Sequence, residues 1–263
     1  MRTNSIRNLL NEGRPTIGTH LFLCDPTAVE IVGHTEAFDY VEFLAEYSAF
    51  DLQRLEEFCR AAELHGLGTM IKVDFESHTF FAQRSVGAGF ESVLFADARG
   101  ANDVQSFVRS LKPDTPDHQG LFGVGARRHA LPMYGGTPPY VKALDDVVIA
   151  VMIEKEKAVT DLEAILEVSN VDLVQWGPSD YSMSIGRPGD EQHSSVLEAE
   201  RRVIAACHEA GVPCRAEIGS VDDAKRYADL GVRHFSLGYD LFILHDVLKD
   251  GGERLRVAVE EAV

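Results

Sequence analysis

Eight short apolar runs, most of them followed by a longer amphipathic stretch, constrain the fold of this 263-residue chain more than any other feature. Several runs are continuously apolar, which is typical of strands that are covered on both faces. Strands that alternate with helices are parallel and are joined by right-handed crossovers. Eight such units predict a single (β/α)₈ (TIM) barrel over residues 1–263 rather than an open doubly wound sheet. The predicted strands are residues 15–22, 38–44, 67–73, 91–96, 147–153, 171–176, 212–218 and 234–238.

Three stretches between these runs show the apolar spacing and the end signals of helices. Residues 51–66 and 195–211 each end at a glycine, the usual helix stop. Residues 160–170 open with a threonine that has a glutamate three residues later, which predicts a capping box at Thr160. An open nucleotide-binding sheet is disfavoured, because no G-x-G-x-x-G follows the first strand and there is no P-loop.

One segment interrupts the alternation. Residues 112–140 are rich in proline and glycine and have no clear period. A loop of this length inside a compact domain is usually functional or disordered. Since it falls between the fourth and fifth predicted strands, we expect part of it to lie over the carboxyl ends of the strands, where barrel active sites are found.

Charge and composition exclude several classes of function. The formal net charge is −17, which repels phosphate backbones and makes nucleic acid an unlikely partner. An anionic substrate would need a local cation to offset this charge. No apolar run reaches the length that spans a bilayer, so no membrane association is expected. The four cysteines are scattered without paired short spacings, which favours a reducing cytoplasm over a disulfide-rich location.

Two acidic residues end neighbouring predicted strands. Glu154 closes the fifth strand, and Asp180 follows the sixth strand 26 residues further along the chain. Adjacent strands lie roughly 4.8 Å apart, so both carboxylates can reach one ion at the barrel mouth. Two oxygen ligands with open positions suit Mg²⁺ or Mn²⁺ best, with Co²⁺ or Zn²⁺ as alternatives. The competing interpretation is that Glu154 pairs with Lys155 or Lys157 and that Asp180 only caps a helix.

Glu46 and Lys72 repeat this interval at the ends of the second and third predicted strands. A lysine that faces the mouth offers a fixed positive charge to a substrate oxyanion. It could instead form a Schiff base, which requires a depressed pKa, or pair on the rim with Asp74 or Glu76. Tyr47, next to Glu46, is a candidate proton donor or acceptor. Glu217, at the end of the seventh strand, is left without a role.

The G-P-S-D sequence at residues 177–180 offers a binding site for a carboxylate. Gly177 and Pro178 predict a tight turn, from which the amides of Ser179 and Asp180 point to the mouth and bind a substrate carboxylate. A plain turn between strand and helix is the alternative. In the 112–140 segment, Arg127 is a candidate for binding a second, distal carboxylate, although loop arginines are more often solvated.

Residues 151–189 resemble the class II, metal-dependent 2-oxo acid aldolases of the HpcH/HpaI type, and the G-P-S-D block is the most specific part of the match. The resemblance extends through most of the chain and implies a barrel of the phosphoenolpyruvate/pyruvate-domain type. It implies that Glu154 and Asp180 bind a divalent metal and that the amides of Ser179 and Asp180 hold a pyruvate carboxylate. It also implies a homohexamer in which a C-terminal helix packs on a neighbouring subunit.

The acid–base residues depart from the family pattern. Tyr47 stands where the family has a histidine, Lys72 replaces an arginine, and Met152 replaces a glutamine. Together with the resemblance, these residues predict a carbon–carbon lyase that acts on a small 2-oxo acid through a metal-stabilised enolate, with Lys72, Tyr47 and Glu46 as catalytic residues. The alternatives are a decarboxylase or condensing enzyme that uses the same enolate, and a paralogue that binds an oxo acid without turnover.

Overall fold

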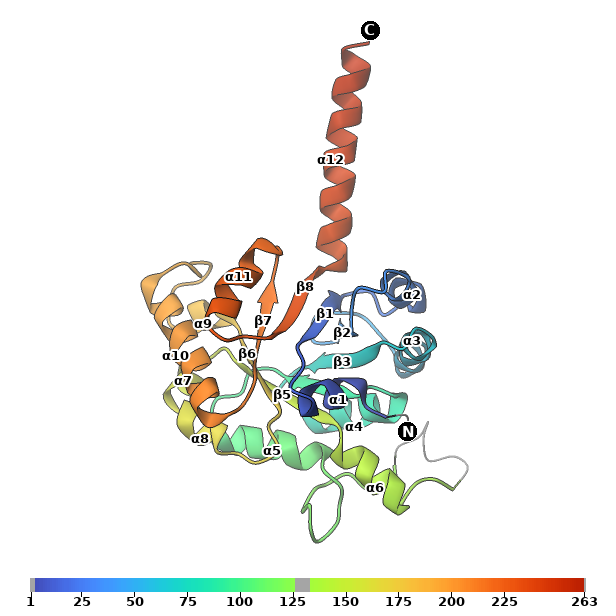
Figure 1. The fold of residues 1–263 in the computed structure, drawn as a ribbon, viewed down its shortest axis with the longest axis vertical. Coiled ribbons are helices and arrows are strands. Elements are labelled where there is room, and N and C mark those ends of the chain that lie inside the picture. The colour runs from blue at the N-terminus through green and yellow to red at the C-terminus, as the bar shows by residue number, and fades with distance from the viewer. Residues whose placement is uncertain (1–2, 126–132, 263) are drawn as a thin grey trace.

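The computed structural model describes residues 3–125 and 133–262, and its centre is a closed barrel of eight parallel strands in the order β1 to β8. Every strand predicted from the sequence is present, with its ends moved by at most a few residues. Helices surround the barrel on its outside (Figure 1). The strands are β1 Thr16–Leu21, β2 Tyr40–Leu44, β3 Gly68–Val73, β4 Ser92–Phe95, β5 Val148–Ile153, β6 Leu173–Trp176, β7 Cys214–Ile218 and β8 His234–Tyr239.

The helices begin and end at residues whose side chains or glycine backbone explain the boundary. Asp51 caps α3 by accepting the amide of Arg54, and Gly66 and Gly211, both with positive φ, follow the ends of α3 and α10. The helices are α1 Ser5–Asn11, α2 Pro26–His34, α3 Leu52–Leu64, α4 His78–Ala88, α5 Ala101–Leu111, α6 Pro138–Asp145, α7 Glu156–Thr160, α8 Leu162–Leu166, α9 Pro178–Ser184, α10 Ser194–Ala210, α11 Asp222–Asp229 and α12 Asp240–Glu260.

The capping box predicted at Thr160 is wrong. Thr160 is the last residue of α7, and its hydroxyl donates to the carbonyl of Glu156. The break between α7 and α8 falls at Asp161, whose carboxylate accepts the amide of Ala101 in the first turn of α5. The Asp161 side chain thus binds the amino end of α5, a helix distant in the sequence, and does not cap α8.

The apolar core has two parts, one inside the barrel and one between the strands and the surrounding helices. Inward-facing side chains from the strands, among them Met70, Leu94 and Leu173, form a cluster inside the barrel. Ile6 of α1 belongs to the same cluster, and Asn4 donates to the carbonyls of Glu91 and Asp146. The α1 helix thus closes the amino end of the barrel and leaves the carboxyl ends of the strands as the open mouth.

The expectation that the 112–140 segment lies over the mouth is wrong for the part that the structure describes. The segment follows α5 and runs into the start of α6, so it lies at the amino ends of the strands. Its described residues contact these outer helices: Lys112 pairs with Asp145 of α6, and Gln83 of α4 donates to the carbonyl of Leu121. Arg127 lies outside the described residues.

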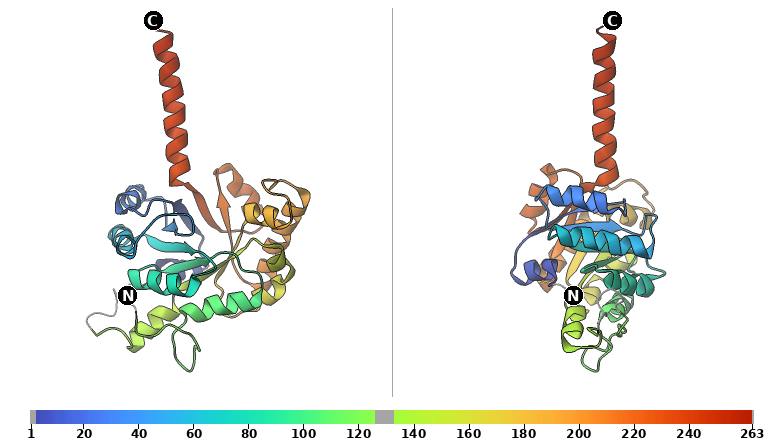
Figure 2. Two further views of the ribbon diagram at one scale, coloured as in Figure 1. Left: turned by 180° about the vertical axis from the view of Figure 1, so that it is seen from behind. Right: turned by 90° about the vertical axis from the view of Figure 1, so that its right-hand side faces the viewer.

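The last helix, α12, projects away from the barrel in every view (Figures 1 and 2). Its side chains are exposed along the whole helix, including Phe242, Ile243, Val247 and Leu248. It has 21 residues but is interrupted by many charged side chains. Among the helices that the structure describes, none has the length and apolar character needed to cross a bilayer.

Candidate active site

A cavity of about 580 Å³ opens at the carboxyl ends of the strands. Side chains from β2, β3, β5, β6, β7 and β8 meet there because the strands are parallel and end at the same edge of the barrel. The cavity brings together most of the residues predicted from the sequence: Tyr47, Lys72, Glu154, Gly177, Pro178, Ser179 and Asp180. Glu217, to which the sequence assigned no role, lines it as well.

Glu154 follows β5 and is only 2% exposed. Its Oε1 accepts the backbone amide of Asp97 at 2.7 Å. Burial raises the pKa of Glu154 to about 7, although the charge of Lys72 and the Asp97 amide act in the opposite direction. A buried carboxylate whose ionised form is disfavoured in this way is a good ligand for a cation, because the cation replaces the lost hydration.

Gly177 stands directly beside Glu154, since β5 and β6 are paired with Ile153 opposite Trp176. A Cβ atom on Gly177 would lie 2.7 Å from Cβ of Glu154 and 2.8 Å from both Oε2 of Glu154 and Cε of Met152. Only glycine fits here, so the close approach of the two strand ends keeps the Glu154 carboxylate in one position.

Gly177→Ala is expected to displace the Glu154 carboxylate, lower turnover at least about tenfold and destabilise the fold by about 1–3 kcal/mol through overpacking. Steady-state kinetics and urea unfolding measure the two effects. Gly219→Ala adds the same methyl group in the same cavity, where a Cβ meets no atom within 4 Å, and it should leave the free energy of unfolding unchanged. Equal unfolding free energies for the two variants would contradict this account.

Asp180 lies in the first turn of α9, at the third position after the N-cap Gly177. Lys155 Nζ donates to Asp180 Oδ1 at 2.6 Å and lies 2.6 Å from Asp97 Oδ1. Lys155 therefore forms ion pairs with Asp180 and Asp97, and not with Glu154 as the competing interpretation of the sequence suggested. The second carboxylate oxygen of Asp180 can still bind a cation. Asp180 is also close enough to Glu154 that its charge raises the pKa of Glu154.

Lys72 is the last residue but one of β3 and points to Glu46 and Tyr47, not to Asp74 or Glu76. Its Nζ lies 2.8 Å from Glu46 Oε2 and donates to the Tyr47 hydroxyl at 2.6 Å. Burial alone would lower the pKa of Lys72, but the charges of Glu154 and Glu46 outweigh it and raise the pKa. A Schiff base requires the neutral amine, so the structure favours the fixed positive charge.

Tyr47 keeps its proton. Much of its ring is exposed, but the hydroxyl end lies against Lys72, and burial raises the pKa of this phenol further than Lys72 lowers it. The geometry thus supports a hydrogen-bonding phenol and disfavours the interpretation of Tyr47 as a base at neutral pH.

The G-P-S-D turn forms as predicted, with Pro178 as the first residue of α9 and Ser179 as the second. The amides of Ser179 and Asp180 belong to the first turn of the helix, where no intrahelical acceptor is available to them. The Ser179 hydroxyl donates to Glu191, a residue that also lines the cavity.

Sequence reasoning missed a polar cluster inside the barrel, below the cavity. Arg215 Nη2 donates to Oε2 of Glu42 and lies 3.3 Å from Nε2 of His20. Gln175 Nε2 donates to Glu217 Oε2 at 2.9 Å. The available signal was the presence of charged residues inside otherwise apolar strands, above all Arg215 and Glu217, whose spacing of two places them on one face of β7.

Comparisons with known proteins agree on one family. The sequence model of the HpcH/HpaI aldolase/citrate lyase family matches residues 21–246. The hydroxypyruvate/pyruvate aldolase of Delftia acidovorans is 26% identical over 92% of this chain and 88% of its own length. The 4-hydroxy-2-oxo-heptane-1,7-dioate aldolase of Shigella sonnei is 27% identical over 92% and 90%, respectively. The crystal structure of a family protein from Burkholderia cenocepacia is 26% identical, with a TM-score of 0.87 over 97% of this chain and all of that one.

Proposed function

The chain belongs to the HpcH/HpaI aldolase/citrate lyase family, and from this membership and the geometry of its cavity we propose that it is a divalent-metal-dependent aldolase acting on a small 2-oxo acid such as pyruvate. The observation that carries the proposal is the arrangement of Glu154 and Asp180 beside each other, with the ammonium of Lys72 fixed in the same cavity.

Glu154 and Asp180 fit a divalent cation by the chemistry of their donor atoms. Both offer carboxylate oxygens, and Lys72, whose charge lowers the pKa of Glu154, is itself paired with Glu46. Within residues 3–125 and 133–262, no group of three or more His, Cys, Asp or Glu side chains is close enough to hold a metal. Water and substrate would supply the other ligands. Mg²⁺ and Mn²⁺ accept a site with few protein ligands and several water ligands more readily than Zn²⁺ does. When bound, the ion supplies positive charge that stabilises negative charge on the oxo acid.

Cleavage of the carbon–carbon bond also requires groups that bind the substrate and stabilise negative charge, and residues of the cavity provide them. The 4-hydroxyl group of a 4-hydroxy-2-oxo acid gives up its proton to solvent, the C3–C4 bond breaks, and C4 leaves as an aldehyde. The electron pair moves to the C2–C3 bond, which places negative charge on the C2 oxygen, and C3 then takes up a proton. Lys72 faces this developing charge, and Tyr47 and Glu46 hold Lys72 in place. The first-turn amides of Ser179 and Asp180 bind the carboxylate.

Release of pyruvate from a 4-hydroxy-2-oxo acid tests the proposal. With Mg²⁺ or Mn²⁺ we expect steady release, loss of activity in EDTA, and recovery when the metal is returned. Exchange of the pyruvate methyl protons with deuterium, followed by NMR, reports on the same chemistry without an aldehyde. Undiminished cleavage in EDTA would refute the metal dependence, and tight pyruvate binding without exchange or cleavage would favour an oxo-acid-binding protein.

We also propose that the protein is a cytoplasmic homo-oligomer and, by resemblance, a hexamer. The exposed apolar side chains of α12, such as Leu244 and Val247, support an oligomer because a contiguous apolar surface of this kind usually lies in an interface. Light scattering of the full chain should give a multiple of 29.0 kDa. A monomer at micromolar concentration would contradict this part of the proposal.

A further inference from the structure

The active-site cavity has two sides with different chemistry. In a closed barrel of eight strands, β3 and β7 are four strands apart and therefore lie opposite each other. Lys72 of β3, Glu154 after β5 and Asp180 after β6 form the side to which we assign the oxo acid. The opposite side comes from β7, β8, β1 and α12 and consists of Phe22, Glu217, Ile218, Gly219, Tyr239 and Phe242.

Glu217 is the charged residue of this second side, and it is held in place from below. Gln175, almost completely buried on β6, donates to its Oε2 at 2.9 Å, and Nε2 of His20 lies 3.7 Å from the same oxygen. The Glu217 side chain is nevertheless 32% exposed, so its carboxylate faces the cavity. A carboxylate fixed in this way acts as a preorganised hydrogen-bond acceptor for a ligand.

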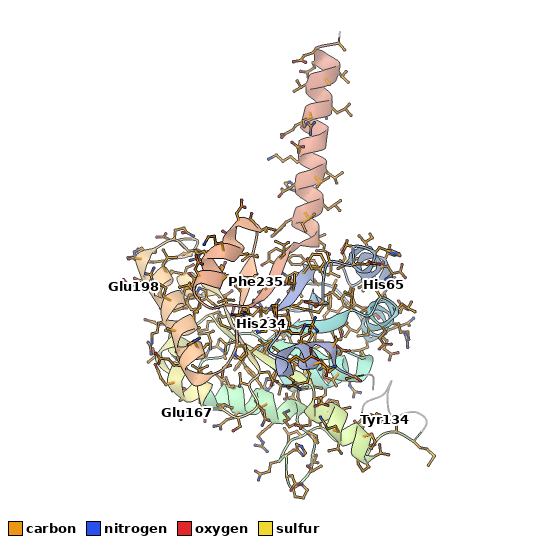
Figure 3. The ribbon with its side chains drawn as sticks, viewed as in Figure 1. His65, Tyr134, Glu167, Glu198, His234 and Phe235 are labelled. Atoms are coloured by element: carbon orange, nitrogen blue, oxygen red, sulfur yellow. The ribbon has the colours of Figure 1, made fainter. Side chains whose placement is uncertain are left out.

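The buried cluster beneath Glu217 supplies the rigidity. His20 stacks on Tyr239 of the same cavity wall with ring centroids 4.7 Å apart, and its Nδ1 contacts the carbonyl of Gly238 at 3.0 Å. Arg215 and Glu42 lie within the barrel against the other edge of His20. Figure 3 labels His234 and Phe235 at the start of β8, the strand that ends at Tyr239 of the cavity wall.

The charges of this side favour one class of ligand. Among the described residues that line the cavity, Lys72 is the one basic side chain, and it lies across the barrel from Glu217. Arg215 is closer to Glu217, but it is buried below the cavity and paired with Glu42, so it does not face a ligand. A second carboxylate on the ligand would approach Glu217 without a facing cation, which costs free energy in a partly desolvated site. A hydroxyl group can donate to Glu217, and the rings of Phe22, Tyr239 and Phe242 offer apolar surface to carbon-bound hydrogens.

We propose that Glu217 is a specificity-determining residue that accepts a hydrogen bond from a hydroxyl group of the aldehyde, so that the enzyme selects uncharged, hydroxylated aldehydes over aldehydes that carry a second carboxylate. This inference rests on the proposed aldolase function. It adds the class of the second substrate and assigns its binding to the β7–β8–β1 side of the cavity.

The test compares three aldehydes as partners of pyruvate: glycolaldehyde, propionaldehyde, which has a methyl group in place of the hydroxyl, and succinic semialdehyde, which carries a carboxylate. The variants are Glu217→Gln, which removes the charge, and Glu217→Met, which removes the acceptor. We expect the ratio of kcat/KM for glycolaldehyde to that for propionaldehyde to fall about tenfold or more in Glu217→Met. In Glu217→Gln, kcat/KM for succinic semialdehyde should rise relative to propionaldehyde.

Comparing each ratio of kcat/KM in a variant with the same ratio in the wild type removes the contribution of the intrinsic reactivity of each aldehyde. Glu198→Gln, on the outer face of α10 (Figure 3), makes the same charge change outside the cavity and should leave all ratios as in the wild type. Unchanged ratios in both Glu217 variants, or a wild-type preference for succinic semialdehyde, would overturn the inference. Exchange of the pyruvate methyl protons by the wild-type enzyme separates the Glu217 inference from the aldolase proposal. If the Glu217 variants fail the test but the wild type shows exchange, only the inference is wrong. If the wild type shows neither exchange nor cleavage, the aldolase proposal itself fails.

Discussion

Glu154→Gln is expected to lower kcat for carbon–carbon cleavage by about a thousandfold, which corresponds to the loss of several kcal/mol of charge stabilisation by a bound ion. Glutamine preserves the shape of the side chain and the acceptor for the Asp97 amide but removes the charge that holds the cation. Calorimetric titration with Mn²⁺ should show the same variant binding the metal much more weakly.

Stability separates this effect from misfolding. Because burial already disfavours the ionised form of Glu154, the glutamine variant should be at least as stable as the wild type in the absence of metal. Glu156→Gln, an exposed charge change two residues further on in α7, should retain turnover within about twofold. If Glu154→Gln retained both metal binding and turnover, Glu154 would have no part in the metal site.

Arg215→Met is expected to destabilise the protein by about 3–5 kcal/mol, the largest effect on folding that we predict for a single change. Arg215 is 1% exposed and Glu42 is fully buried, so removing the guanidinium leaves a carboxylate inside the barrel without its counter-charge. Burial would lower the pKa of Arg215, but Glu42 raises it above its usual range, so the guanidinium stays charged. Urea unfolding followed by circular dichroism measures the loss.

A double variant identifies the cause. Arg215→Met combined with Glu42→Leu removes both charges and should recover most of the stability, because replacing a whole buried pair with apolar side chains is often neutral. Arg202→Met breaks the exposed pair with Glu163 and should cost at most about 1 kcal/mol. If the double variant were as unstable as Arg215→Met alone, loss of packing rather than an unpaired charge would explain the effect.

The buried pair also shows the limit of sequence reasoning in this chain. His20 and Glu42 face each other on the consecutive strands β1 and β2, but Arg215 comes from β7, and only closure of the barrel brings it to them. A charged residue in an apolar strand indicates that a partner is needed, but it does not identify the partner. The same holds for Asp97, whose amide binds Glu154 from the turn after β4 with φ at 61°.

The sequence by itself determined the barrel and most of its mouth. Apolar runs of strand length separated by amphipathic helices are local patterns, and parallel strands must end at one edge, so Glu154, Asp180, Lys72 and Gly177 meet there without further information. Tertiary structure alone decided which groups pair at that edge: Lys155 with Asp180, Lys72 with Glu46 and Tyr47, and Glu217 with Gln175. The physical reason is that strand ends are set by short-range periodicity, whereas ion pairs depend on distances of a few ångströms between side chains, which the packing of the whole barrel sets.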